Sequence, residues 1–276
     1  FFDVLREFGA SIIKALEKME VDAQLYLITN LAIVAFGFIF LQISPTVRSF
    51  SYAYVFGTAL GAITTLYVLR KHFQGLFSNF TAKLLKPIFF SAWPFAISAV
   101  LSGLMINTDM LLIGVFRPAS DVGYYSAAER IAQLLALVPI LIAVSVFPIF
   151  SRTANRDNER MRHILERVIS LSFLFALPIT LGGTILAVPI INLIFGADYL
   201  PAAAPFGILI IGLSINFAAF ALSNAIFAYN RQKALIVSAL IGGLLNAALD
   251  LVFIPIFGIV GSAWATLLSL TATNVY

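Results

Sequence analysis

The fold of this chain is decided by residues 87–152, which read PIFFSAWPFAISAVLSGLMINTDMLLIGVFRPASDVGYYSAAERIAQLLALVPILIAVSVFPIFSR. Two apolar runs, 89–116 and 124–150, flank a short polar turn that contains Arg117, Pro118, Ser120 and Asp121. A helix needs about 20 residues to cross a bilayer, and both runs are longer than that. The stretch therefore predicts two antiparallel transmembrane helices joined by a tight turn.

Charged residues lie inside this predicted helix pair: Asp109 in the first run, and Glu129 and Arg130 in the second. A charge in hydrocarbon is costly unless it is paired or hydrated, so it marks a candidate functional site. Counted from the turn near residue 120, Asp109 lies 11 residues before and Arg130 lies 10 residues after. At about 1.5 Å per residue, both are roughly 15 Å below the turn. We expect Asp109 and Arg130 to form an ion pair or to line one aqueous cavity, whereas Glu129 points about 100° away from Arg130.

The composition places the whole chain in the membrane. Hydrophobic residues make up 61% of the 276 residues, charged residues only 11%, and the mean hydropathy is +1.00. A soluble domain carries about 25% charged residues. The sequence thus predicts an all-α polytopic membrane protein. It contains no cysteine, which excludes disulfides, and its net charge of +4 does not indicate a nucleic-acid partner. The chain opens inside a helical pattern and ends inside an apolar run, which predicts a fragment of a longer protein.

Hydrophobic periodicity predicts about eight spans and an amphipathic segment before them. The amphipathic segment covers residues 1–20 and is either the end of a membrane helix or a helix along the surface. Gly57 and Gly61 form a G-x-x-x-G pair that permits close helix contact, although two ordinary glycines fit equally well. The predicted spans are 24–41, 51–69, 89–116, 124–150, 168–195, 203–229, 234–256 and 260–276.

Basic residues alternate from one side of the predicted bundle to the other. One set of loops holds only Arg48 and Arg117, and the opposite set holds thirteen of the 17 lysines and arginines. Because basic loops stay in the cytoplasm, the thirteen-residue side is predicted to be cytoplasmic. These residues are Lys14, Lys18, Arg70, Lys71, Lys83, Lys86, Arg152, Arg156, Arg160, Arg162, Arg167, Arg231 and Lys233.

Further polar groups lie within the other spans and complete the set of candidate substrate-binding and translocation residues. The set either lines a hydrated central cavity or forms interhelical bonds that fix the packing. Its members are Asn107, Asp109, Glu129, Arg130, Asn246 and Asp250.

No motif in the sequence predicts catalysis. The two histidines fall in polar loops, and H-E-x-x-H, G-x-S-x-G and the phosphate-binding G-x-x-x-x-G-K-[ST] are absent. We therefore expect no enzymatic activity, no cofactor and no metal ligands.

Several motifs in a fixed order resemble those of the polysaccharide-repeat (O-antigen type) flippases, a family of the multidrug/oligosaccharidyl-lipid/polysaccharide exporter superfamily. The first are INTDMLLIGVF, VGYYSAAERI and VFPIFSR; LIFGADYLPAAAPFGIL, AIFAYNRQK and LNAALDLVFIPIFGIVGSAWAT follow. The resemblance implies a two-lobe exporter of twelve or more helices. Residues 1–87 would supply the last helices of the N-terminal lobe and a cytoplasmic linker, and residues 88–276 a C-terminal lobe truncated in its last helix.

The resemblance also implies a function: flipping of a polyprenyl-pyrophosphate-linked oligosaccharide across the cytoplasmic membrane by alternating access, for polysaccharide biosynthesis. The implied partners are this lipid-linked oligosaccharide, membrane lipids, a coupling ion (H⁺ or Na⁺) and glycan polymerase or assembly proteins. Two alternatives remain open at this point: a cation-coupled drug exporter of the same superfamily and a membrane-embedded enzyme of glycan assembly.

Overall fold

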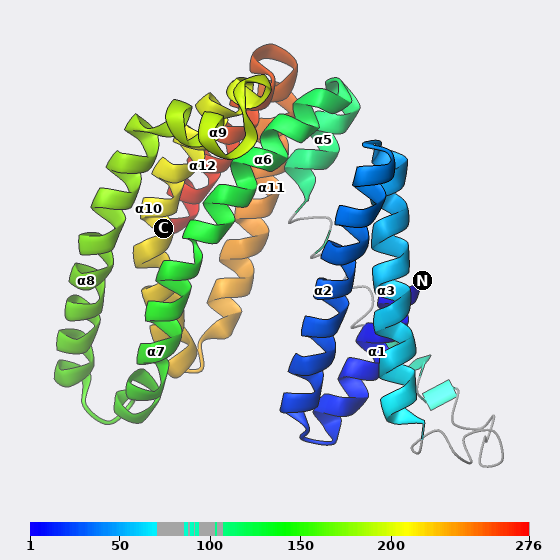
Figure 1. Cartoon of the computed structure of the whole chain (residues 1–276). Coiled ribbons are helices and arrows are strands. Elements are labelled where there is room, and N and C mark those ends of the chain that lie inside the picture. The colour runs from blue at the N-terminus through cyan, green and yellow to red at the C-terminus, as the bar shows by residue number, and fades with distance from the viewer. Residues whose placement is uncertain (71–85, 88, 91, 94–102, 104–106, 276) are drawn as a thin grey trace. The chain divides into compact units, whose positions relative to one another are not determined.

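The computed structural model describes the chain except residues 71–85, 88, 91, 94–102, 104–106 and 276. The described residues form helices and turns and contain no β-strand, which confirms the predicted all-α fold. They divide into two compact units, Phe1–Trp93 and Pro94–Tyr276 (Figure 1). Six of the described helical segments are long and apolar enough to cross a membrane. The predicted lobe boundary after residue 87 lies beside residues outside the described part, and the lobe assignment stays a prediction.

The first unit contains α1 (Phe2–Ala15), α2 (Met19–Ile43) and α3 (Val47–Leu69). The predicted spans 24–41 and 51–69 fall within α2 and α3. Thr46 caps the start of α3. Its side-chain oxygen accepts a hydrogen bond of 3.3 Å from the backbone N–H of Ser49, a group that has no partner inside the helix. The amphipathic segment forms α1, whose buried Ile13 packs against Leu25 of α2 and Leu69 of α3. This apolar contact holds α1 against the two longer helices.

The glycine pair of α3 lies where α2 comes closest. A Cβ atom added at Gly57 would lie 2.7 Å from Cα and 2.8 Å from the backbone nitrogen of Ile33, and one at Gly61 would overlap Thr29. A backbone atom cannot move aside as a flexible side chain can. The G-x-x-x-G pair therefore mediates close contact between these two helices.

We expect Gly57→Ala to lower the free energy of unfolding by about 1–3 kcal/mol, because the added methyl group overpacks the helix contact. Gly37→Ala on α2 is the matched control, since a Cβ atom there meets no heavy atom within 4 Å. That control should be neutral or stabilising by up to about 1 kcal/mol, the usual gain of replacing a helical glycine by alanine. Thermal unfolding in detergent measures both variants, and equal shifts would contradict the close contact.

The second unit begins with α5 (Thr108–Phe116), α6 (Ala119–Leu135) and α7 (Leu137–Thr153). It continues with α8 (Asn158–Ile185), α9 (Ala187–Phe195), the short 3₁₀ helix η2 (Ala197–Ala202) and α10 (Ala203–Ala228). The last hairpin is α11 (Gln232–Phe257) and α12 (Ile259–Val275). The predicted spans from 203 onward correspond to α10, α11 and α12, whereas residues 91, 94–102 and 104–106 of the span 89–116 lie outside the described residues.

Two predicted spans are each divided in the structure. The span 124–150 is α6 and α7, which are separated at Ala136, and the span 168–195 is α8 and α9, which are separated at Leu186. In each case a proline, Pro139 or Pro189, follows the break by three residues. Proline has no N–H for the carbonyl four residues earlier, and its ring clashes with that carbonyl. The prolines thus explain why a continuous apolar run does not form one straight helix.

The connections of the second unit gather at two opposite ends (Figure 1). One end holds the α7–α8 and α10–α11 connections, where the hydroxyl of Tyr229 donates a hydrogen bond of 2.9 Å to Asn158 Oδ1. The other end holds the turns α5–α6 and α11–α12 and the helix η2. The basic loops of this unit thus share an end, as the charge alternation requires. Which compartment that end faces stays a prediction.

Candidate functional site

Asp109 is the centre of a polar cluster in the second unit. Its Oδ2 accepts hydrogen bonds from the hydroxyl of Tyr125 at 2.6 Å and from Thr266 Oγ1 at 2.8 Å. Its Oδ1 accepts a hydrogen bond of 2.6 Å from the side-chain amide of Asn246. Hydrogen bonds to an ionised carboxylate are roughly twice as strong as neutral ones. A single carboxylate therefore ties together α5, α6, α11 and α12.

Asn246 links this carboxylate to a second one. Its Nδ2 also donates to Asp250 Oδ2 at 3.0 Å, and its Oδ1 accepts a hydrogen bond of 3.0 Å from Ser269 Oγ. The side chain of Asp250 is fully buried. Among the described residues, its Oδ1 and the buried hydroxyl of Ser262 have no hydrogen-bond partner. We call the set of Asp109, Tyr125, Asn246, Asp250, Ser262, Thr266 and Ser269 the carboxylate cluster.

The register of two hairpins explains why these residues meet. Asp109 and Tyr125 each lie eight residues from Arg117, at the α5–α6 turn. Asp250 and Thr266 each lie eight residues from Gly258, at the α11–α12 turn. Eight helical residues span about 12 Å, so all four lie at one depth below their turns.

The two turns also lie against each other. Gly258 has a φ of +64°, which glycine adopts without strain, and a Cβ atom there would lie 3.1 Å from the guanidinium of Arg117. The Nε of that guanidinium forms an ion pair of 3.0 Å with Asp121. Contact at the turns therefore sets both hairpins at a common height.

The structure corrects the predicted depth of Arg130. Because α6 begins at Ala119, the turn is centred near Arg117 and Pro118 rather than near residue 120. Tyr125 is the residue level with Asp109, and Arg130 lies five residues, or about 7.5 Å, further along α6. The ion pairs within the described residues do not join Asp109 and Arg130, so the ion-pair alternative is wrong. The alternative of a shared cavity stays a prediction.

The remaining predicted residues lie apart from the cluster. Asn107 is exposed, and its amide donates a hydrogen bond of 2.7 Å to the carbonyl of Gly103. Glu129 is half-buried and accepts a hydrogen bond of 3.0 Å from Gln133, one turn further along α6. Thus Asp109, Asn246 and Asp250 come together, whereas Glu129 and Arg130 lie deeper along α6.

Sequence reasoning missed the hydroxyl groups of Tyr125, Ser262, Thr266 and Ser269. A serine or threonine in a helix commonly bonds the carbonyl of the preceding turn, so its presence alone indicates no site. Thr266 does make that bond, at 3.1 Å to the carbonyl of Ser262, and it donates to Asp109 as well. The equal spacing about the two turns was the available signal.

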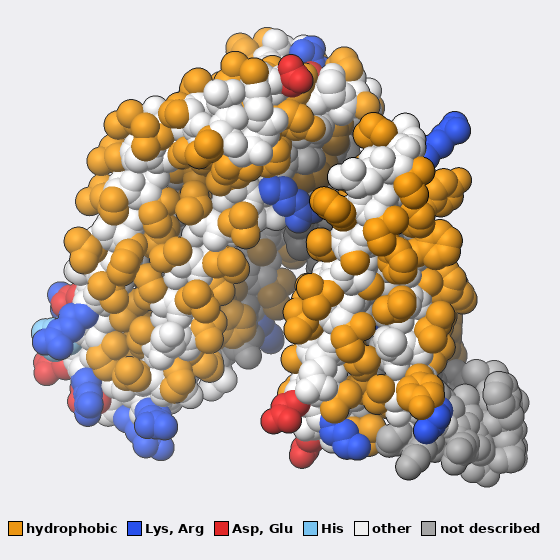
Figure 2. Space-filling model, viewed as in Figure 1, with side chains coloured by type: hydrophobic (Ala, Val, Ile, Leu, Met, Phe, Trp, Pro, Cys, Tyr) orange, Lys and Arg blue, Asp and Glu red, His pale blue; other side chains and the backbone are white. Residues whose placement is uncertain are grey.

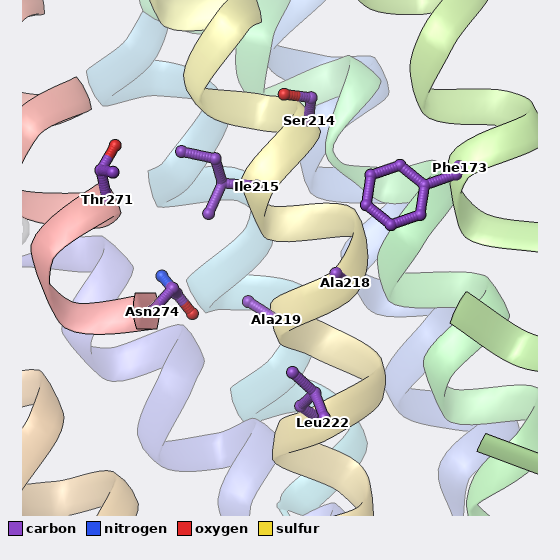
Figure 3. A pocket seen from close by; sticks show the side chains of 8 residues that line it. All are labelled: Phe173, Ser214, Ile215, Ala218, Ala219, Leu222, Thr271 and Asn274. Carbon is purple, nitrogen blue, oxygen red and sulfur yellow. The ribbon is translucent and has the colours of Figure 1, made fainter. Parts of the chain in front are cut away.

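An apolar pocket of ≈ 250 Å³ lies elsewhere in the second unit (Figure 3). Phe173 of α8, Ser214, Ile215, Ala218, Ala219 and Leu222 of α10, and Thr271 and Asn274 of α12 line it. None of the predicted site residues is among them. In the described part of the chain, no group of three or more His, Cys, Asp or Glu side chains could hold a metal ion.

Membrane-length helical segments and a part-buried, hydrogen-bonded carboxylate cluster are typical of polytopic membrane transporters, in which intramembrane acidic groups mark ion and substrate pathways. The chain belongs to the family described as "Polysaccharide biosynthesis protein", whose model matches residues 2–154. The model of the MatE family matches residues 94–252.

Curated relatives support this assignment. The putative O-antigen transporter of Shigella flexneri is 24% identical over 83% of this chain and 55% of its own length. The probable low-salt glycan biosynthesis flippase Agl15 of Haloferax volcanii is 24% identical over 98% of this chain and 56% of its own length. The chain thus spans about half the length of these relatives.

Solved structures share the fold. The lipid II flippase MurJ, in an inward closed conformation, matches all of this chain and 59% of its own with a TM-score of 0.80 at 24% identity. A MOP superfamily transporter from Pyrococcus furiosus matches 67% of this chain and 42% of its own with a TM-score of 0.56 at 22% identity. The chain therefore shares the fold of these two solved proteins.

Proposed function

We propose that this chain is part of a flippase that moves a polyprenyl-pyrophosphate-linked oligosaccharide across the cytoplasmic membrane for polysaccharide biosynthesis. The observation that carries the proposal is the match of the polysaccharide biosynthesis family to residues 2–154. Transport proceeds by alternating access and leaves the substrate chemically unchanged, so the protein is not an enzyme. Glycan polymerase or other assembly proteins then receive the product.

Arg130 is the proposed contact for the pyrophosphate. Its side chain is exposed and forms no ion pair with any described residue. A guanidinium binds phosphate oxygens bidentately through its planar fork of N–H donors. The offset of about 7.5 Å along α6 also separates it from the negative charge of Asp109.

The carboxylate cluster is the proposed site of the coupling ion, H⁺ or Na⁺. Asp109 and Asp250 share the amide of Asn246 as a donor, and no basic side chain among the described residues pairs with either carboxylate. A buried and a half-buried carboxylate that share one donor and have no counter-charge are costly. A proton or a small cation at the unpartnered Oδ1 of Asp250 relieves that cost, and the hydroxyl and carboxylate oxygens suit a hard cation.

A cation-coupled drug exporter is the second candidate, and two observations favour it. The MatE family model matches residues 94–252, and Asp109 is not neutralised by Arg130 as the sequence suggested. A cationic drug could approach such an acidic cluster. The two candidates differ in substrate charge.

Expression of the full-length protein in cells that lack their own flippase distinguishes the flippase from the drug exporter. A flippase restores the surface glycan and moves a labelled lipid-linked oligosaccharide across proteoliposomes without altering its mass. A drug exporter instead lowers the accumulation of cationic dyes and leaves the glycan absent. Replacing Na⁺ by K⁺ at constant pH, and then varying pH, identifies the coupling ion.

We expect a single cysteine at Arg156 to resist a membrane-impermeant thiol reagent in intact cells, and one at Ser120 to react. Both positions are exposed and lie at opposite ends of the second unit, and the chain has no cysteine of its own. The physical reason is the excess of basic loops on the side of Arg156. The reverse labelling pattern would overturn the proposed orientation.

A further inference from the structure

A groove of ≈ 760 Å³ runs between α7 and the first turns of α8. Val146 and Ile149 of α7 form one wall. The other wall is a single face of α8 and the residue that precedes it, because most of its members are three or four residues apart. These are Asp157, Glu159, Arg160, His163, Ile164, Arg167, Val168 and Leu171. We call this feature the α7–α8 groove.

The lining of the groove changes in a fixed order along α8. The acids Asp157 and Glu159 come first. The basic residues Arg160, His163 and Arg167 follow with Ile164 among them, and only apolar residues line the groove beyond Arg167. Figure 2 shows both signs of charge gathered at this end of the unit, with hydrophobic side chains along the helices beyond it. Along the first turns of α8, the lining of the groove thus changes from acidic through mainly basic to apolar.

The acids and the arginines of the groove are not paired with each other in the described part of the chain, whereas His163 lies 3.7 Å from Glu166. Asp157 uses only its Oδ1, which accepts the backbone N–H of Arg160 at 2.9 Å as a helix cap. By contrast, Arg162 on another face of α8 is paired with Glu166 at 2.8 Å.

The length of α8 places this end at the level of lipid headgroups. The helix has 28 residues, whereas about 20 cross the hydrocarbon core. All of its charged residues lie between Glu159 and Arg167, and none follows before Ile185. The first turns therefore lie in the interfacial region, and the arginine stems can extend along apolar surface toward the headgroups.

We propose that the α7–α8 groove binds an ethanolamine phospholipid. Its primary ammonium contacts Asp157 and Glu159, its phosphate contacts Arg160 and Arg167, and an acyl chain lies against Val146, Ile149, Val168 and Leu171. From the headgroup inward, such a lipid presents an ammonium, a phosphate and an apolar chain in the order in which the groove presents acids, bases and apolar residues. Its zwitterionic headgroup also matches a lining that carries both signs of charge.

The test uses the full-length protein in nanodiscs that contain equal amounts of phosphatidylethanolamine, phosphatidylcholine and phosphatidylglycerol. Native mass spectrometry after transfer to detergent counts the retained lipids. We expect phosphatidylethanolamine to be retained over both other lipids. An exposed ion pair contributes up to about 1 kcal/mol, so Arg160→Gln with Arg167→Gln, which removes two contacts with the phosphate, lowers its retention by up to about 30-fold.

Two further variants separate this lipid from other occupants. Glu159→Lys should lower retention of phosphatidylethanolamine and raise that of phosphatidylglycerol, a pair of opposite changes that misfolding cannot produce. Arg162→Gln is the matched control on the same helix and should change neither. Equal retention of phosphatidylglycerol and phosphatidylethanolamine by the unaltered protein, or an effect of Arg162→Gln as large as that of the double variant, would overturn the proposal.

Discussion

Replacing Asp109 with alanine is expected to lower the free energy of unfolding by about 3 kcal/mol or more. The change removes the carboxylate that accepts hydrogen bonds from Tyr125, Thr266 and Asn246. Donors on three helices then lose this acceptor. A buried polar group without a partner costs about 1–3 kcal/mol, and these donors lie in a part-buried site where water replaces the acceptor only in part. Thermal and chemical unfolding of the full-length protein in detergent measure the loss.

Asp121→Ala is the control for this prediction. Asp121 is also the acceptor of one ion pair, but that pair lies at the exposed α5–α6 turn, with Arg117. Exposed ion pairs contribute about 0–1 kcal/mol, so the control should change stability by no more than that. Asp109→Asn, which keeps one acceptor oxygen, should fall between the two. If Asp109→Ala and Asp121→Ala lowered the free energy of unfolding by the same amount, Asp109 would not hold the four helices together.

Replacing Arg130 with glutamine is expected to slow transport of the lipid-linked oligosaccharide by about 10- to 150-fold while stability changes little. A hydrogen bond to a charged group contributes about 1.5–3 kcal/mol, which corresponds to that range. The side chain is exposed and forms no ion pair with the described residues, so its loss leaves no buried partner behind. The initial rate of flipping in proteoliposomes measures the effect.

Arg130→Lys and Arg162→Gln complete the experiment. Lysine keeps the charge but not the bidentate geometry, so it should restore transport in part. Arg162 is exposed on α8 and paired with Glu166, and its replacement should leave transport near the normal rate. Normal transport by the Arg130→Gln variant would show that another residue supplies the cation.

Most of the fold could be predicted from sequence because hydrocarbon imposes long apolar runs, and those runs mark α2, α3, α10 and α11 directly. The breaks at Ala136 and Leu186 could not be read from hydropathy, because the residues on both sides are equally apolar. They follow instead from the missing N–H groups of Pro139 and Pro189.

The site was predicted less completely, and the reason is geometric. Placing the turn about three residues too far along the chain moved the expected partner of Asp109 from Tyr125 to Arg130. One helical residue rotates the side chain by about 100°, so an error of a few residues selects a different neighbour. Asn246 and Asp250 were among the predicted residues because they are polar groups inside predicted spans, whereas hydroxyl groups carry no such signal.

The break at Ala136 also determines where the α6–α7 segment can bend at low cost. The carbonyl of Leu135 has no helical donor, since the residue four positions later is Pro139. Hydrogen bonds from α6 to Asp109 and to the neighbouring helices restrain α6, and α7 packs separately through Phe150 against α8 and α10. A change of angle at Ala136 therefore sacrifices no i-to-i+4 bond at that carbonyl, and α10, which packs against both α6 and α7, limits how far the two helices can turn relative to each other.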